Sequence, residues 1–237
     1  MFDSISAWFL SLFQSIGWDE ATVSMMLWGI FDSIYMTVGS SLFAYLLGFP
    51  LGILLVTSAE GGIRPCRPLF RVLDVVINIT RSIPFLILMV AVVPFTRLIV
   101  GTAIGATATI VPLVLAAAPF VARMVESSIL EVDRGVIEAA QSMGSTNLQI
   151  IWKVMLPEAR PSLINGAAIA TTTILSYSAM AGAIGGGGLG AIAINYGYYR
   201  YEDLMMLISL VLLVVLVQIL QKIGTKATGL ADKRKVQ

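Results

Sequence analysis

The spacing that most resembles a chemical motif is a run of glycines in the last quarter of the chain. Gly185, Gly187 and Gly190 satisfy G-x-G-x-x-G, the pattern with which dinucleotide-binding domains hold a pyrophosphate. Such a site also needs a preceding strand and an acidic residue about 20 positions later. Here an apolar stretch precedes the glycines, and Glu202 and Asp203 follow too early. We therefore interpret the glycines as a turn that lets two backbones approach closely, with ligand binding as the alternative.

The side chains that perform most covalent catalysis are absent or isolated. The 237 residues include no histidine and one cysteine, Cys66, which excludes Ser-His-Asp and Cys-His catalysis, Cys/His zinc sites and an intrachain disulfide. No Gly-Lys-Ser/Thr follows a glycine loop, so the chain has no P-loop of its own for ATP. A net charge of +1 offers no basic excess for nucleic acid. The sequence thus predicts a protein that is not an enzyme and binds no cofactor, metal or nucleic acid.

The composition points to a lipid bilayer. Hydrophobic residues make up 57% of the chain and charged residues 12%, and the mean hydropathy is +0.89. A helix needs about 20 apolar residues to cross a hydrocarbon core of about 30 Å. Stretches with few or no charges predict an all-α membrane protein, a single domain 1–237, with five spans at about 33–56, 75–96, 98–122, 161–183 and 204–221.

The basic residues predict how the chain is oriented. Twelve of the fifteen Lys and Arg residues flank the predicted spans on one side, Arg97 and Arg200 lie on the other, and Arg81 lies within the second span. By the positive-inside rule, the C-terminus is cytoplasmic and the N-terminus is outside. Residues 1–20 hold tryptophans but no Lys or Arg, and we expect either an interfacial helix or disorder there.

Polar side chains within the predicted spans are candidates for a transport pathway. Arg81 lies one or two turns inside the second span, where it either snorkels to the cytoplasmic surface or contacts a substrate. In the fourth span, Ser176, Tyr177 and Ser178 precede Met180. Their hydroxyls either form hydrogen bonds within the helix bundle or line a pathway for a small zwitterion, with Met180 as a flexible gate.

The one long polar segment, residues 123–160, is predicted to form two short helices joined by a glycine. Asp133 is a candidate N-cap of the first helix, and Gly144 stands where that helix would end in the left-handed conformation. Thr146 and Gln149 have the spacing of a capping box that begins the second helix, and Pro157 and Pro161 are expected to end it. Both helices carry apolar residues on one side, which either lie on the membrane and the chain's own spans or bind a partner.

This segment resembles the cytoplasmic EAA loop of binding-protein-dependent ABC import permeases. The resemblance rests on six residues at the family's spacing: Glu138, Ala139, Ala140, Gly144, Leu156 and Pro157. It extends over nearly the whole chain, from the first span to the last, and is greatest to the methionine-importing members. The further matching segments are Arg81-Ser82-Ile83-Pro84-Phe85, Pro94-Phe95-Thr96-Arg97, Ala118-Pro119-Phe120-Val121-Ala122-Arg123 and Tyr177-Ser178-Ala179-Met180. Val154, where the family usually has Ile, is a small departure.

The resemblance implies a type I ABC importer permease in a bacterial cytoplasmic (inner) membrane. Such a chain works as a symmetric dimer with two ATP-binding cassette subunits, which use ATP and Mg, and with an extracytoplasmic substrate-binding lipoprotein. The helix that starts after Asp133 would be the coupling helix that docks on an ATPase subunit, with Glu138 as an anchoring carboxylate and Gly144 as the hinge.

The resemblance also implies alternating-access import of methionine, as the L form or as both stereoisomers. Another small amino acid or a short peptide remains an alternative substrate. A rival from a different class is a secondary transporter driven by an ion gradient. That rival predicts buried carboxylates within the spans, whereas Asp32 and Asp74 are expected only at span edges.

Overall fold

The computed structural model describes residues 19–231, and within that range all regular structure is helical. Most of the predicted N-terminal interfacial helix therefore lies outside the described residues. The elements, in chain order, are α2 (Glu20–Ser58), α3 (Arg67–Ser82), α4 (Phe85–Ala91), α5 (Val93–Val100), α6 (Ala106–Leu130), α7 (Arg134–Ser142), α8 (Asn147–Ile150), η1 (Ile151–Met155), α9 (Leu156–Glu158), α10 (Arg160–Ala181), η2 (Gly182–Ile184), α11 (Gly188–Ile192), η3 (Ala193–Tyr198) and α12 (Asp203–Ala231). The predicted all-α class is confirmed.

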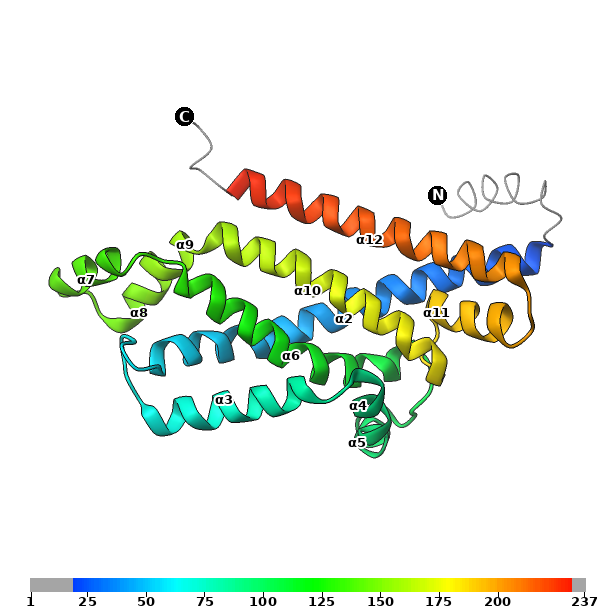
Figure 1. Cartoon of the computed structure of the whole chain (residues 1–237), viewed down its shortest axis with the longest axis horizontal. Helices are drawn as coiled ribbons and strands as arrows, with labels where there is room; N and C mark the ends of the chain where they lie inside the picture. Colours follow the sequence, from blue (N-terminus) through cyan, green and yellow to red (C-terminus); the bar gives the residue numbers. More distant parts are fainter. Residues whose placement is uncertain (1–18, 232–237) are drawn as a thin grey trace.

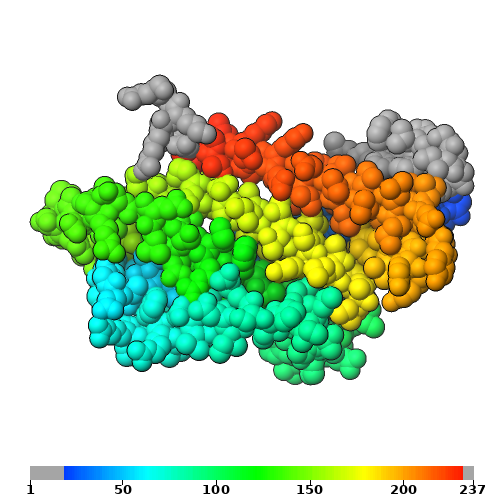
Figure 2. All heavy atoms as spheres, in the orientation of Figure 1, coloured from blue at the N-terminus to red at the C-terminus, as the bar shows by residue number. Residues whose placement is uncertain are grey.

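The long helices run lengthwise beside one another (Figure 1). Four helical stretches are long and apolar enough to cross a membrane, namely α2, α6, the stretch Arg160–Tyr198 and α12, and α3 with α4 makes a fifth if that bent pair is one span. Figure 2 shows α12 along one long edge of the molecule and α3, α4 and α5 along the other. The short helices α7 and α8 project at one end of the bundle.

The second predicted span, 75–96, is not one straight helix. The helix α3 begins earlier, at Arg67, and ends at Ser82, after which the chain bends by 101° into α4. Pro84 accounts for the break, because a proline disfavours the helical conformation in the residue before it and cannot donate a backbone hydrogen bond. The sequence predicts the start of this span too late because it looks for a run of uncharged residues, whereas α3 carries charged residues along its length.

Charged residues also fail to mark the ends of α2 and α6. The first span was predicted from 33, but α2 begins at Glu20, where the Asp19 carboxylate accepts a hydrogen bond of 2.9 Å from the Thr22 N–H. Hydrogen bonds from the side chain and backbone of Thr22 lower the pKa of the Asp19 carboxyl. The third span was predicted at 98–122, but α6 continues to Leu130, so the polar connection to α10 is shorter than the predicted 123–160.

Two glycines explain why α6 starts later than predicted. Gly101 adopts a left-handed conformation (φ 82°) at the end of α5, and Gly105 (φ 99°) precedes α6. A glycine accepts these backbone angles without steric cost, so an uninterrupted apolar sequence contains a turn here. The predicted fourth span, 161–183, agrees closely with α10, whereas α12 runs ten residues past the predicted end at 221.

Two further glycines allow α2 and α6 to pack closely. A Cβ atom on Gly48 would lie 2.5 Å from the carbonyl oxygen of Ala118, and one on Gly52 would lie 2.6 Å from that of Ala122. These distances leave no room for a larger side chain. Spacing small residues four apart along a helix, as here, is a common way for membrane helices to approach each other.

The glycine-rich segment after α10 is a turn, as the sequence analysis favoured. Gly185, Gly187 and Gly188 have φ values of 86°, 86° and 73°, and a Cβ atom on Gly190 would lie 2.1 Å from the carbonyl oxygen of Ala179. The turn folds α11 back against α10, and the Leu189 N–H donates a hydrogen bond of 2.9 Å to the Ser33 hydroxyl of α2. The glycines therefore serve backbone packing.

Candidate functional site

The projecting helix α7 has the caps that the sequence predicts. The Asp133 carboxylate accepts a hydrogen bond of 2.7 Å from the Gly135 N–H at the start of the helix. Gly144, with φ 76°, ends it in the left-handed conformation, and the Ser145 N–H donates a hydrogen bond of 3.1 Å to the carbonyl oxygen of Ala140. This hydrogen bond reaches back across the glycine and fixes the direction in which the chain leaves α7.

The second short helix begins with the predicted capping box. The Thr146 N–H donates to the Gln149 side chain at 2.8 Å, and the Gln149 N–H donates to the Thr146 hydroxyl at 3.4 Å. Pro157 was expected to end this helix, but it lies inside α9, and the helical path breaks at Ala159. The π-helical turn η1 precedes the proline, and such a turn already interrupts the regular ladder of backbone hydrogen bonds, so a proline is tolerated there.

One side of α7 packs on the bundle and the other is open. Ala140 is 3% exposed and joins the core cluster that contains Ile150 and Met155, with Leu156 packed against it. Glu138, Ala139 and Pro157 are exposed. The inner side of α7 covers the chain's own helices, as the first of the two predictions states. Met143, directly after α7, is 79% exposed, and binding of a partner there stays a prediction.

A polar stripe along α3 is the feature that the sequence analysis missed. Its members recur at intervals of three or four residues, which places them on one side of the helix. They are Arg67, Arg71, Asp74, Asn78 and Arg81. A helix side that carries charges of both signs, in a chain this apolar, indicates contact with water or with other polar groups rather than with lipid. The spacing of these residues in the sequence was the available signal.

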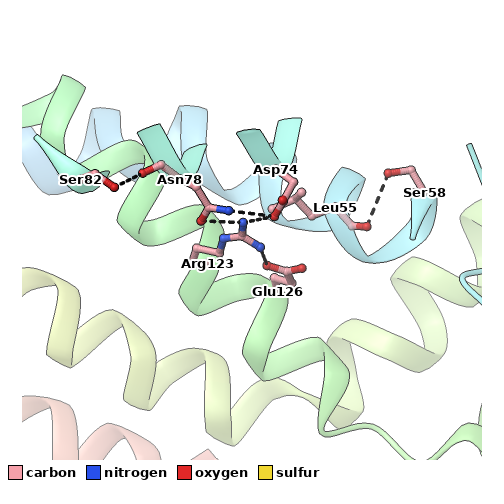
Figure 3. Close-up of polar contacts among 7 residues, drawn as sticks. All are labelled: Leu55, Ser58, Asp74, Asn78, Ser82, Arg123 and Glu126. Carbon is pink, nitrogen blue, oxygen red and sulfur yellow. Dashed lines mark hydrogen bonds and ion pairs between the residues drawn. The ribbon is translucent and has the colours of Figure 1, made fainter. Parts of the chain in front are cut away.

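The middle of this stripe pairs with Arg123 of α6, which also pairs with Glu126 of its own helix (Figure 3). The Arg123 guanidinium forms an ion pair with Asp74, donates a hydrogen bond of 3.0 Å to the Asn78 side-chain oxygen, and pairs with Glu126 at 2.6 Å. Asn78 in turn donates to Asp74 at 3.2 Å. The side chains of Arg123, Asp74 and Glu126 are 19%, 33% and 14% exposed. We call Asp74, Asn78, Arg123 and Glu126 the α3–α6 polar cluster.

The α3–α6 polar cluster corrects two placements made from sequence. Asp74 was expected at the edge of a span, but it lies halfway along α3. Arg123 was assigned to the polar loop, but it lies within α6, seven residues before the end of that helix. Asp74 and Arg123 are 49 positions apart in the chain. Because their charges neutralise each other, neither charge ends the helix that carries it.

Arg81 lies at the end of α3, far from the start of that helix. Because α3 starts at Arg67, Arg81 is in its last turn and about 21 Å along the helix at the usual rise of about 1.5 Å per residue. The choice between snorkelling and substrate contact for Arg81 stays a prediction. Its side chain is exposed and has no ion-pair partner within residues 19–231.

The four candidate residues of α10 separate into two groups. Ser178 is buried, and its hydroxyl donates to the Leu175 carbonyl oxygen at 2.8 Å, while Tyr177 stacks on Phe85 of α4 with ring centroids 4.8 Å apart. Ser176 and Met180 lie four residues apart on an exposed side of the helix. The Ser176 hydroxyl also donates to its own helix backbone, at 3.2 Å to the Thr172 carbonyl oxygen. The hydrogen-bonding interpretation thus holds for both serines, and only the side with Ser176 and Met180 is open.

The described residues offer little for a metal site. Between residues 19 and 231, no group of three or more His, Cys, Asp or Glu side chains is placed to hold a metal ion. The arrangement instead offers an exposed short helix, α7, at one end of the bundle, opposite charges paired between α3 and α6, and an exposed arginine, Arg81, at the end of α3.

Comparison with known proteins places these features in a family. The family described as "Binding-protein-dependent transport system inner membrane component" matches residues 48–228. The "Probable D-methionine transport system permease protein MetI" of Vibrio cholerae is 48% identical over 217 residues, which cover 92% of this chain and 96% of that protein. The D-methionine transport system permease protein MetI of Escherichia coli (strain K12) is 48% identical over 163 residues, covering 69% and 75% of the two chains.

Similarity to solved structures supports the assignment to this family. A chain of the MetNI methionine ABC transporter, solved in an inward-facing conformation, has a TM-score of 0.90 and 45% identity and covers 91% of this chain and 100% of that one. A chain of an amino acid ABC transporter solved with histidines has a TM-score of 0.69 at 20% identity, covers 95% of this chain and 98% of that one, and shows a shared fold. The chain therefore has the type I ABC importer permease fold and belongs to the family of binding-protein-dependent transport system inner membrane components, which are permease subunits rather than enzymes.

Proposed function

We propose that the chain is the permease subunit of an ATP-driven methionine importer in a bacterial cytoplasmic membrane. The observation that carries this proposal is similarity over almost the whole length to proteins named for methionine transport, at 48% identity to one permease and 45% to a MetNI chain. Two copies of the chain, two ATPase subunits that use ATP and Mg, and an extracytoplasmic binding protein would form the transporter. D-methionine is named for the relatives, and both stereoisomers are candidate substrates.

The distribution of charge supports a cytoplasmic position for the end that carries α7. The α2–α3 connection, the start of α7 and the end of α12 lie at this end (Figure 1). Basic residues gather there: Arg64, Arg67, Arg71, Arg134, Lys222 and Lys226. The connection between η3 and α12, with Arg200, lies at the opposite end. Cytoplasmic connections of membrane proteins are enriched in Lys and Arg.

The coupling site in this proposal is the outer side of α7. Glu138 and Ala139 are exposed there and would contact an ATPase subunit, while Ala140 anchors the helix to the bundle. Gly144 holds the turn, and Leu156 packs against the same core cluster as Ala140. Pro157 completes the loop and stays exposed beside it. A displacement of α7 by the ATPase would therefore pass to α6 and α10 through packed side chains rather than through a flexible loop.

The pathway in this proposal passes the end of α3, where Arg81 lies, and the open side of α10. Stacking of Phe85 on Tyr177 holds the chain that follows α3 against α10. Arg81 would attract the carboxylate of an amino-acid substrate, and Ser176 and Met180 would line the path beside it. A second copy of the chain would supply the facing wall, which keeps the Arg81 charge out of contact with lipid.

Reconstitution tests the proposed function. The tagged chain is purified with its accompanying subunits and returned to liposomes, and uptake of radiolabelled methionine is measured with and without ATP. We expect uptake only when the ATPase subunits, the binding protein and ATP are all present. Uptake of a different amino acid under the same conditions would replace the substrate, and uptake by the permease alone along an ion gradient would replace the mechanism.

Arg81→Gln is expected to raise the methionine concentration for half-maximal uptake about tenfold, because a charge-assisted hydrogen bond to a carboxylate is worth about 1.5–3 kcal/mol. The matched control is Arg71→Gln, which removes the same charge from the same helix side about 15 Å away along the helix. The control should keep the wild-type concentration dependence. Equal behaviour of the two variants, with assembly intact, would remove Arg81 from the pathway.

A further inference from the structure

An apolar groove lies at the end of α2, away from the proposed pathway. Its volume is about 400 Å³. One wall consists of Pro50, Ile53 and Leu54 of α2, and the other of Leu148, Ile151 and Trp152, which α8 and η1 supply. Neither α7 nor α3 contributes a lining residue. The groove therefore involves neither α7 nor the polar side of α3, although α8 and η1 belong to the same loop as Gly144 and Leu156.

The groove continues an apolar stripe on the outside of α2. Leu42, Leu46, Pro50 and Leu54 recur every four residues along the helix and are exposed, so the stripe runs lengthwise and ends in the groove. Leu148 and Trp152 line the groove in which the stripe ends, and their side chains are 70% and 63% exposed. In a chain that spans a membrane, such a surface extends from the bilayer core to its boundary, which suits a hydrocarbon chain.

A single unpaired cation stands at the rim of this groove. Arg64 lines the groove, and its backbone N–H donates a hydrogen bond of 3.0 Å to the carbonyl oxygen of Thr57, which fixes it just beyond the last turn of α2. Its guanidinium is exposed and has no ion-pair partner within residues 19–231. Arg67, three residues later, is paired with Glu60 at 2.6 Å. Arg64 is thus the one cation among the residues that line the groove, and its charge is free to pair with a ligand.

The polar groups in the groove argue against a peptide occupant. The Thr57 hydroxyl already donates to the Ile53 carbonyl oxygen at 2.8 Å, which leaves Asn147 and Arg64 as the polar side chains of the lining that can bind a ligand. A peptide backbone buried here would find few hydrogen-bond partners, which is costly in an apolar setting. A phospholipid avoids this cost, because its acyl chain needs no partner and its phosphate can form paired hydrogen bonds with a guanidinium. Tryptophan, as at Trp152, is a residue type that favours the headgroup level at the membrane–water boundary.

We propose that this groove binds an anionic phospholipid. One acyl chain lies along the α2 stripe under Trp152, and the phosphate lies against Arg64. The bound lipid contacts both the end of α2 and α8, and so it stabilises the position of α8, the helix that follows α7 in the chain. Removing the lipid makes α7 less firmly held and lowers the ATPase activity of the assembled transporter.

The experiment measures lipid retention by the complex that co-purifies with this chain. Native mass spectrometry counts phosphatidylglycerol and phosphatidylcholine molecules that remain bound after each lipid is titrated in detergent. We expect the wild type to prefer phosphatidylglycerol, and Arg64→Gln to weaken that binding roughly fivefold. Arg67→Gln is the matched control, since it removes a nearby charge outside the groove and should bind like the wild type.

A second variant tests the apolar walls. Leu54→Trp fills the groove but keeps Arg64, and it should also lose phosphatidylglycerol. Equal retention by Arg64→Gln and Arg67→Gln, or no preference between the two lipids, would overturn the proposal. A disulfide between two copies that carry Trp152→Cys and Cys66→Ser would overturn it as well, because a second chain would then occupy the groove. These readouts do not depend on which substrate is transported.

Discussion

Gly144→Val is expected to reduce ATP-driven uptake at least tenfold while the permease remains inserted in the membrane. Gly144 has φ 76°, a conformation that a β-branched residue adopts only with strain of about 1–2 kcal/mol. Nothing lies within 4 Å of a Cβ atom placed there, so a clash at Cβ is not the cause of an effect. The substitution would disturb the hydrogen bond from Ser145 to Ala140 and change the angle at which α7 meets the ATPase subunit.

The control for this prediction is Gly144→Asn. Asparagine also adds a Cβ atom but tolerates the left-handed conformation, so uptake should stay near the wild-type level. Co-purification of the ATPase subunits and ATP hydrolysis stimulated by the binding protein are measured for both variants beside uptake. Equal activity of the valine and asparagine variants would show that the direction of α7 is not needed for coupling.

Local signals explain why the polar segment was predicted well. Asp133, Gly144, Thr146 and Gln149 act on neighbours within five residues, and each makes the cap or turn that its type favours. The residue type and spacing are then sufficient, because no distant part of the chain has to be known. The six family-matched residues likewise fall in one short stretch, but their contacts with an ATPase subunit are a proposal that depends on another protein.

Long-range contacts explain what the sequence could not give. Counting charges assumes that a charge ends a span, yet Arg123 lies inside α6 because Asp74 of α3 neutralises it. Contacts with distant parts of the chain also decide where the hydroxyls of α10 lie. Ser176 and Ser178 are two residues apart and look alike in the sequence, but one faces outward and the other is buried against the bundle. Only the packing of neighbouring helices decides between them.

The α3–α6 polar cluster supports the second large prediction. Arg123→Leu removes the one cation that lies between Asp74 and Glu126, and it leaves two carboxylates facing each other between packed helices. Breaking a buried ion pair in this way costs about 3–5 kcal/mol, and partial exposure of Asp74 places the expected loss toward the lower end. We expect the melting temperature of the purified complex to fall clearly. Thermal unfolding followed by fluorescence, without a thiol-reactive dye, measures this temperature.

The triple variant Arg123→Leu, Asp74→Leu and Glu126→Leu separates charge from packing. Replacing a whole buried ionic group by apolar side chains is often neutral or stabilising, so the triple variant should recover most of the stability that Arg123→Leu alone loses. If the triple variant melts as early as the single variant, the loss comes from missing Arg123 packing rather than from unpaired carboxylates. Recovery would instead show that charge balance between α3 and α6, and not arginine as such, allows these two helices to pack together.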